Sequence, residues 1–147
     1  MCEILLLGNP LLRERSSTVT EFDSKETLSQ IAQLKKTLDE FRRENGFGRG
    51  IAAPQIGILK RIIALDLGKG SFVIVNPQIV SVSGFKFTMW DDCMSFPDLL
   101  VRLERDSSID LKYRDEIGIE HEWLNLGHAE SELLQHEIDH LDGILAI

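Results

Sequence analysis

The sequence predicts an α+β fold in which antiparallel sheets pack around a C-terminal helix, with a second helix towards the N-terminus. Apolar residues recur every three to four positions between residues 25 and 45. Segments rich in isoleucine, valine and phenylalanine follow from residue 61 and are joined by short turns. A second helical pattern near the C-terminus carries His136 and His140. Because histidines four positions apart lie on one face of a helix, this helix is predicted to bind metal.

The composition is that of an ordinary globular protein, with 43% hydrophobic and 27% charged residues, and we expect residues 1–147 to form one domain. The net charge of −8 leaves no basic stripe for phosphates, so nucleic acid is not an expected partner. No apolar run approaches the roughly 18 to 20 residues of a membrane span, and the start lacks the basic segment of a signal peptide. We therefore expect a cytoplasmic protein without a membrane partner, in which Cys2 has no role and the two cysteines are not bridged.

The first 22 residues are expected to be extended and irregular. Asp23 and Glu26 then have the spacing of a capping box, with an acceptor at the N-cap and a glutamate three residues later. A helix should follow and should end at Asn45-Gly46, because glycine is a common helix stop. Its apolar stripe is expected to pack into the core.

Residues 47–57 are rich in glycine and alanine and are expected to form a tight loop between the first helix and the sheet. Small residues let the backbone approach a neighbouring group closely. Gln55 adds a side-chain amide that can both donate and accept hydrogen bonds. The lysine and hydroxyl of a phosphate-binding loop and the spacing of a dinucleotide fingerprint are missing, so a nucleotide site is not expected here.

Five strands are expected after this loop, because β-branched and aromatic residues are concentrated in five segments. Short connections between neighbours favour antiparallel pairing. The last helix is expected to begin at Glu130 or Ser131 and to end at Gly143. The expected strands cover residues 61–66, 71–76, 79–87, 108–113 and 117–124.

The last helix has the form of a metal site. His136 and His140 can bind one ion, and Glu137, one position further round, leans towards the open side of that ion and can act as a base. Catalytic sites of this kind usually take three protein ligands. A third ligand must therefore come from another part of the chain.

Cys93 is the strongest candidate for this third ligand. A thiolate with two imidazoles suits zinc or ferrous iron, and the negative charge of the thiolate offsets the dication. The carboxylates of Asp91, Asp92 and Glu132 compete for the position. The residue types alone leave this choice open.

Three segments of the chain together resemble the three motifs of the peptide deformylases. They run from Gly48 to Gln55, from Asp91 to Ser95 and from His136 to His140. The segments occur in the order of that family and at similar spacings, and the resemblance extends over nearly the whole chain. We therefore expect the chain to be a member of this family.

The resemblance implies a metal-dependent hydrolase that removes the N-formyl group from N-formylmethionyl peptides of newly synthesised proteins and releases formate. The partner would be the N-terminus of a nascent chain, with a transient association with the ribosome. The resemblance also implies one divalent metal ion per chain, Fe²⁺ first and Zn²⁺ or Ni²⁺ as alternatives. Its ligands would be Cys93, His136 and His140.

The resemblance assigns roles to the residues around the ion as well. Glu137 would take a proton from water and return it to the leaving amine. The side-chain amide of Gln55 and the backbone N–H of Met94 would hold the developing oxyanion.

By the same resemblance, the backbone groups of Gly48, Arg49 and Gly50 would pair with the extended backbone of the substrate. Glu132 and Leu133 would lie in the pocket for the first side chain, where the family usually has apolar residues. Glu132 is open to three interpretations: a solvated charge, a partner of a metal ligand, or a pocket wall that favours a polar or basic side chain. A substrate with another first side chain is therefore an alternative to N-formylmethionyl peptides.

The middle motif departs from the usual Glu-Gly-Cys-Leu-Ser of the family at three positions. Met94 keeps the backbone N–H of the leucine that it replaces. Asp92 would be strained if its position has a positive φ, whereas Asp91 could still orient a histidine ligand. Many members also continue beyond the metal helix, whereas this sequence ends at Ile147, so thinner support of the site is expected. A non-catalytic homologue that binds formylated peptides is a further hypothesis.

Other conspicuous side chains are expected to be structural. Asp139 is expected to pair with Arg105 and to fix the last helix. The two histidines outside the metal-binding motif are expected at the surface, and the two tryptophans in the core or at the edge of a pocket. These four residues are His121, His128, Trp90 and Trp123.

Overall fold

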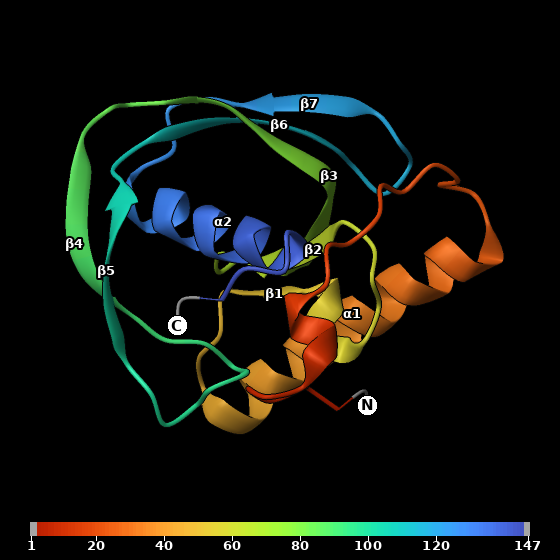
Figure 1. Ribbon diagram of the computed structural model, residues 1–147. Coiled ribbons are helices and arrows are strands. Elements are labelled where there is room, and N and C mark those ends of the chain that lie inside the picture. Colours follow the sequence, from red (N-terminus) through yellow and green to blue (C-terminus); the bar gives the residue numbers. More distant parts are fainter. Residues whose placement is uncertain (1–2, 146–147) are drawn as a thin grey trace.

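The computed structural model describes residues 3–145, so Cys2 and Ile147 lie outside the described residues. In chain order the elements are η1 (Pro10–Arg13), α1 (Lys25–Asn45), β1 (Gly50–Ala52), η2 (Ala53–Ile56), β2 (Ile62–Asp66), β3 (Ser71–Val82), β4 (Lys86–Asp91), β5 (Val101–Asp106), β6 (Ile109–Arg114), β7 (Glu120–Trp123) and α2 (His128–Leu141). α2 lies in the middle of the molecule, and the strands curve around it (Figure 1).

The strands form two antiparallel sheets. Five of them pair in the order β1-β2-β3-β6-β7, and β4 pairs with β5 in a separate two-stranded sheet. The expected α+β class, with antiparallel sheets around a C-terminal helix and a second helix nearer the N-terminus, is confirmed.

Both faces of the sheet are covered at β2. All five residues of this strand are buried, and side chains alternate between the two faces of a strand. Ile63 and Leu65 pack in one core cluster with apolar residues of α2. Ile62 and Ala64 pack in the other cluster with apolar residues of α1. The sheet therefore separates the two helices, and α2 is fixed between the main sheet and the β4-β5 hairpin.

α1 begins one residue later than the capping box indicates. The N-cap is Ser24, whose hydroxyl accepts a hydrogen bond from the backbone N–H of Thr27 at 3.1 Å, so the prediction of Asp23 was wrong. The predicted end is confirmed, because Gly46 has a φ of 75° and caps the helix in the left-handed conformation.

α2 begins earlier than Glu130 or Ser131. Its N-cap is Gly127, whose carbonyl oxygen accepts from the backbone N–H of Ser131 at 2.8 Å. The hydroxyl of Ser131 does not cap the helix, because it donates to the carbonyl oxygen of Asp106 on β5 at 2.8 Å. A tertiary contact thus uses the polar group that the sequence pattern assigns to a cap.

β3 is one long strand from Ser71 to Val82, so the expectation of separate strands at 71–76 and 79–87 with a connection between them is wrong. Asn76 has a φ of 51°, and the register with β6 shifts at this point, which accommodates a proline that lacks an N–H. The side-chain amide of Asn76 accepts from the backbone N–H of Val19 at 2.9 Å and donates to its carbonyl oxygen at 2.8 Å. This residue anchors the N-terminal segment instead of reversing the chain.

The β4-β5 hairpin was not predicted. The strand expected at 79–87 is wrong, because β3 ends at Val82 and β4 begins at Lys86. Arg102 and Glu104 occupy exposed positions of β5, where the burial alternates along the strand. Because β5 packs on one face only, these charged residues interrupt the run of apolar residues by which a strand is recognised in a sequence.

Residues 47–57 are not a plain loop. They contain β1, which pairs with β2 from Gly50↔Leu65 to Ala52↔Ile63, and the short helix η2, which carries Gln55. β1 is an edge strand of the five-stranded sheet. The last predicted strand is also shorter than expected, since β7 covers only Glu120–Trp123.

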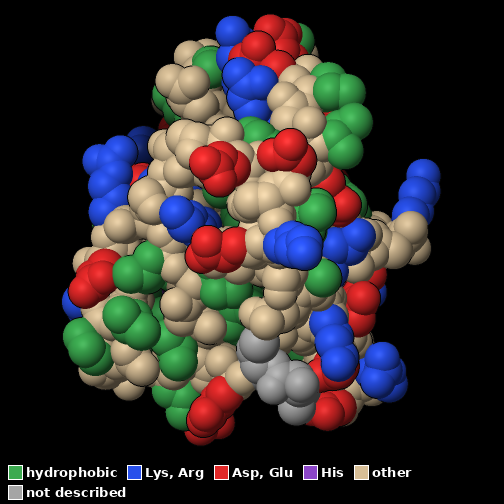
Figure 2. Space-filling view, turned by 90° about the vertical axis from the view of Figure 1, so that its right-hand side faces the viewer, with side chains coloured by type: hydrophobic (Ala, Val, Ile, Leu, Met, Phe, Trp, Pro, Cys, Tyr) green, Lys and Arg blue, Asp and Glu red, His purple; other side chains and the backbone are tan. Residues whose placement is uncertain are grey.

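The exposure of the four histidine and tryptophan side chains outside the metal-binding motif agrees in part with the expectations from the sequence. His121 and His128 are exposed, as expected. Trp123 is half-buried against the core, whereas Trp90 is 64% exposed, so its expected place in the core or at a pocket edge is wrong. On the face drawn in Figure 2, acidic and basic side chains are interspersed. None of the helices among residues 3–145 has the length and apolar character needed to cross a membrane.

Candidate metal centre and active site

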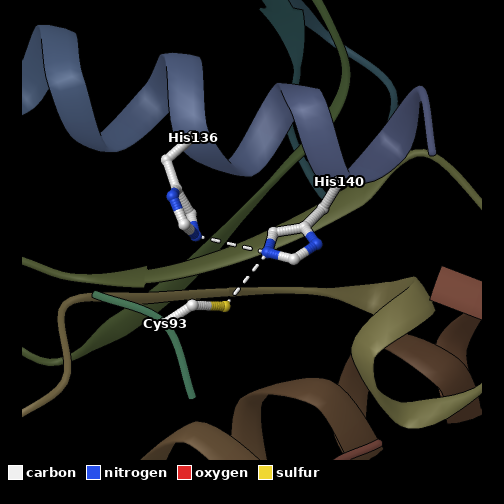
Figure 3. A group of neighbouring side chains, drawn as sticks. All are labelled: Cys93, His136 and His140. Carbon is white, nitrogen blue, oxygen red and sulfur yellow. Dashed lines mark hydrogen bonds between the residues drawn. The ribbon is translucent and has the colours of Figure 1, made fainter. Parts of the chain in front are cut away.

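Three buried donor atoms meet beside α2. His136 and His140 project from one face of the helix, and Cys93 comes from the loop that follows β4 (Figure 3). The Sγ atom of Cys93 lies 3.2 Å from Nε2 of His140, which lies 3.2 Å from Nε2 of His136. The three ligand atoms all lie within 4.8 Å of one another.

This spacing fits one tetrahedral metal ion. Bond lengths of about 2.0–2.3 Å imply ligand-to-ligand distances of about 3.3–3.6 Å, close to those of the cluster. One thiolate with two imidazoles suits zinc or ferrous iron. The competing carboxylates lie outside the cluster: Asp92 is exposed, Glu132 forms an ion pair with Arg49, and Asp91 binds the far side of the His136 ring.

Asp91 orients His136. Its Oδ2 atom lies 2.7 Å from Nδ1 of the histidine, which places a proton on Nδ1 and leaves Nε2 facing the cluster. Arg105 donates to the same Oδ2 at 3.0 Å and to Oδ2 of Asp139 at 2.9 Å. The expected pair of Asp139 with Arg105 is confirmed, and it links β5 to both β4 and α2.

The two histidines differ in charge preference. Burial alone would lower the pKa of His136, but its hydrogen bonds with Asp91 and Cys93 and the nearby charge of Glu137 raise this pKa to about 11. Burial and the adjacent His136 lower the pKa of His140 to about 3. Asp91 thus favours positive charge at the Nε2 side of His136, either a proton or a metal ion, whereas His140 stays neutral, the form in which imidazole binds metals.

Glu137 is a buried acid beside this cluster, with only 2% of its surface exposed. Burial raises its pKa to about 7. Its Oε1 atom lies 3.9 Å from Nε2 of His136, and its Oε2 atom makes no hydrogen bond within residues 3–145. A carboxylate with this pKa and a free oxygen can take up and release a proton near neutral pH.

Gln55 reaches the cluster from η2. Its Oε1 atom accepts from the backbone N–H of Ala52 at 2.9 Å, which fixes the orientation of the amide. Its Nε2 atom donates to Oγ of Ser95 at 3.0 Å and approaches Sγ of Cys93 at 3.5 Å. The donor end of the amide therefore faces the metal cluster.

The cluster opens into a pocket of about 310 Å³. Polar groups of the site, apolar side chains and an ion pair all line it. The residues around it are Phe41, Phe47, Gly48, Arg49, Gly50, Gln55, Asp91, Asp92, Cys93, Met94, Pro97, Glu132, Leu133, His136 and Glu137.

Two glycines keep this pocket open. Gly48 has a φ of 126°, and a Cβ atom there would lie 2.9 Å from side-chain atoms of both Met94 and Phe41. A Cβ atom at Gly50 would lie 3.3 Å from Oε2 of Glu137. Larger residues at these positions would displace the walls of the pocket or the acid.

The chain matches the sequence model of the polypeptide deformylase family over residues 1–147. It belongs to that family. The peptide deformylase of Thermotoga maritima is 35% identical over 149 residues, which are 100% of this chain and 85% of the relative. That of Heliobacterium modesticaldum is 37% identical over 151 residues, 99% of this chain and 91% of the relative. The crystal structure of the peptide deformylase from Thermotoga maritima superposes with a TM-score of 0.87 at 34% identity, covering 99% of this chain and 94% of that one.

Membership of the polypeptide deformylase family establishes the reaction class. The chain is a peptide deformylase, a hydrolase that removes the formyl group from N-formylmethionyl peptides. The family uses a catalytic metal, and Cys93, His136 and His140 form a cluster that fits one.

The departures from the usual deformylase motif are accommodated. Among residues 3–145, the non-glycine residues with positive φ are Asn76 and Asn125, so Asp92 carries no left-handed strain. Met94 lines the pocket, and its backbone N–H makes no hydrogen bond to any described residue. Glu132 is only 7% exposed and pairs with Arg49 rather than with a histidine of the cluster. The interpretations of Glu132 as a solvated charge and as a partner of a metal ligand are therefore wrong.

Sequence reasoning missed some residues of this deformylase pocket. Ser95 is fully buried, and its backbone N–H donates to Sγ of Cys93 at 3.4 Å. Its place two residues after the thiol could have identified it as a thiolate donor. Phe41 and Phe47 pack edge to face, with ring centroids 5.5 Å apart, beside the pocket. No spacing in the sequence indicates that contact, because it depends on the turn after α1.

Proposed function

We propose that Cys93, His136 and His140 bind one divalent metal ion, at which the N-formyl group of an N-formylmethionyl peptide is hydrolysed. The observation that supports this proposal is the convergence of one sulfur and two nitrogen donors, in one pocket, beside a buried acid with an unpaired oxygen. An ion bound there would supply Lewis acidity, since it lowers the pKa of water and polarises a carbonyl group.

Glu137 is the proposed proton carrier. Its raised pKa and its unpaired Oε2 let it accept a proton from the attacking water and then pass that proton to the nitrogen of the leaving amine. The C–N bond of the formamide breaks, and formate and a free amino terminus are the products. Proton transfer of this kind contributes typically about 10²- to 10⁴-fold in rate.

Gln55 and Met94 are the proposed oxyanion donors. The amide of Gln55 is held by Ala52 with its donor end towards the cluster, and the backbone N–H of Met94 makes no hydrogen bond to a described residue. Two such N–H groups would stabilise negative charge as it develops on the formyl oxygen.

The edge strand β1 is the proposed binding site for the substrate backbone. The carbonyl oxygens of Gly48 and Arg49 already accept hydrogen bonds from Arg42 and Asp66. In an antiparallel ladder the next residue points its peptide groups the other way, so those of Gly50 face away from β2 and can pair with an extended peptide. Of the three backbone positions expected from the resemblance, Gly50 is the strongest candidate.

The proposed resident ion is Fe²⁺, with Zn²⁺ and Ni²⁺ as alternatives, because the donor set suits soft and borderline metals. Protein purified without oxygen should contain one ion per chain, and measurement of its metal content together with formate release per ion would identify it. We also propose that residues 1–147 form one domain, which acts in the cytoplasm on nascent chains and associates transiently with the ribosome. The match of the family along the whole chain supports the domain proposal.

The function is tested by formate release from formyl-Met-Ala-Ser by protein loaded with Fe²⁺ under anaerobic conditions. Glu137→Gln should lower the rate by at least about 100-fold while one ion stays bound per chain. Glu130→Gln, on the same helix but outside the pocket, is the matched control and should keep full activity. Equal rates for the two variants would exclude Glu137 as the proton carrier.

A further inference from the structure

An ion pair crosses the wall of the substrate pocket. Nη2 of Arg49, directly before β1, pairs with Oε1 of Glu132 on α2. Nη1 of Arg49 donates to the carbonyl oxygen of Ala129 at 3.2 Å. The side chain of Glu132 is 9% exposed, whereas that of Arg49 is 46% exposed. The carboxylate thus lies inside the wall, and the guanidinium covers it from the solvent side.

The Arg49–Glu132 pair lines the same pocket as Glu137 and the metal-ligand candidates Cys93 and His136. Arg49 and Glu132 line the pocket together with Glu137, and Leu133 follows Glu132 on the same helix. A Cβ atom at Gly50 would lie 3.3 Å from both Leu133 and Glu137, which shows how closely the apolar wall and the acid approach each other. A substrate whose formyl group reaches Glu137 therefore occupies a pocket that this pair lines.

Arg49 balances the charge of Glu132. Its Oε1 atom is paired with Arg49, and its Oε2 atom accepts no hydrogen bond from the described residues. A buried carboxylate without a partner is costly to place beside an apolar group, and it attracts a cation instead. With Arg49 in place the pair is polar but has no net charge.

We propose that Arg49 is a specificity-determining residue: by neutralising Glu132 it makes the pocket select formyl-peptides whose first side chain is uncharged, methionine included, over those with a cationic one. This inference rests on the proposed function of the pocket. It also explains how an acidic residue can stand in the wall of a site that accepts methionine. A lysine side chain would find the carboxylate already paired and would meet the positive guanidinium as well.

The test compares kcat/KM for formyl-Met-Ala-Ser with that for formyl-Lys-Ala-Ser. The wild-type enzyme should prefer the methionine peptide. Arg49→Met, which keeps an unbranched side chain without the charge, should shift the ratio towards the lysine peptide by at least about tenfold. Glu132→Gln should not shift the ratio towards lysine, and the double variant Arg49→Met with Glu132→Gln should return it to within about threefold of wild type.

Two results would overturn the proposal. One is an unchanged ratio in Arg49→Met, which would make the pair only a clamp between β1 and α2. The other is a wild-type preference for the lysine peptide, which would show that the pair does not make the pocket select uncharged side chains.

A second measurement separates this proposal from that of the function. The affinities of the two peptides for Glu137→Gln protein, with and without Arg49→Met, are measured by calorimetry and do not depend on turnover. The same shift towards the lysine peptide is expected in the dissociation constants. If wild-type protein releases no formate while this shift is present, the proposed function fails and the role of Arg49 stands. If formate is released and no shift is present, only the role of Arg49 fails.

Discussion

Replacement of Arg105 by methionine should destabilise the fold, because this residue holds the support of the metal cluster together. Its side chain is 8% exposed and lies between Asp91, which is 5% exposed, and Asp139, which is 36% exposed. Loss of one partner from a buried pair typically costs about 3–5 kcal/mol, and the lower end of that range applies here because His136 still pairs with Asp91. The contact with Asp139 adds little, since solvent screens a carboxylate that is a third exposed.

We therefore expect Arg105→Met to lower the free energy of unfolding by about 3 kcal/mol and the Tm by about 10 °C. Chemical denaturation of metal-free protein is the assay, because a bound ion would add its own stabilisation. Arg102→Met is the matched control: this arginine lies on the same strand but is exposed, and its loss should change stability by less than about 0.5 kcal/mol. Equal effects of the two substitutions would refute the idea that Arg105 is a buried anchor.

Three further predictions concern single groups. Gln55→Ala should reduce kcat by about 10²- to 10³-fold with little change in metal content, and a normal kcat would exclude the amide as an oxyanion donor. Asp91→Asn should weaken metal binding by about 10- to 100-fold in competition with a chelator, since it removes the carboxylate that orients His136; unchanged affinity would contradict that role. The hydrogen bond with His121 and those from nearby backbone N–H groups lower the pKa of Asp115 below its ordinary value of 3.8. Its stabilising contribution is then present above about pH 4 and is lost as the pH falls through the lowered folded-state pKa; an NMR titration midpoint at or above 3.8 would contradict this prediction.

The sequence was most informative where the chemistry is local. The spacing of His136 and His140 on one helix determines that both face the same side, and Glu137 follows from that geometry. The capping signal located the start of α1 to within one residue, and the stop signal located its end. These features depend on neighbours along the chain, which a sequence displays directly.

The β4-β5 hairpin could not be predicted because its pattern is masked by charges. Residues of β5 such as Arg102 and Glu104 face solvent, while Arg105 is buried among carboxylates that are distant in sequence. The sequence does not distinguish a buried arginine such as Arg105 from an exposed one such as Arg102. Only the tertiary arrangement shows which charges are paired.

The same limit applies to the substrate pocket. Glu132 had three interpretations from sequence, and the ion pair with Arg49 excludes two of them, a solvated charge and a partner of a metal ligand. These residues are 83 positions apart in the chain, so no periodicity connects them. Asp92 similarly needed its backbone conformation, which the structure gives and which carries no strain.

The ligand set itself is tested most directly by X-ray absorption spectroscopy of the protein loaded with Zn²⁺. The spectrum should show one sulfur ligand at about 2.3 Å and two imidazole nitrogens at about 2.0–2.1 Å. Cys93→Ser should remove the sulfur contribution and leave the imidazoles. A wild-type spectrum with nitrogen and oxygen ligands only would contradict the assignment of Cys93, His136 and His140 as the metal site.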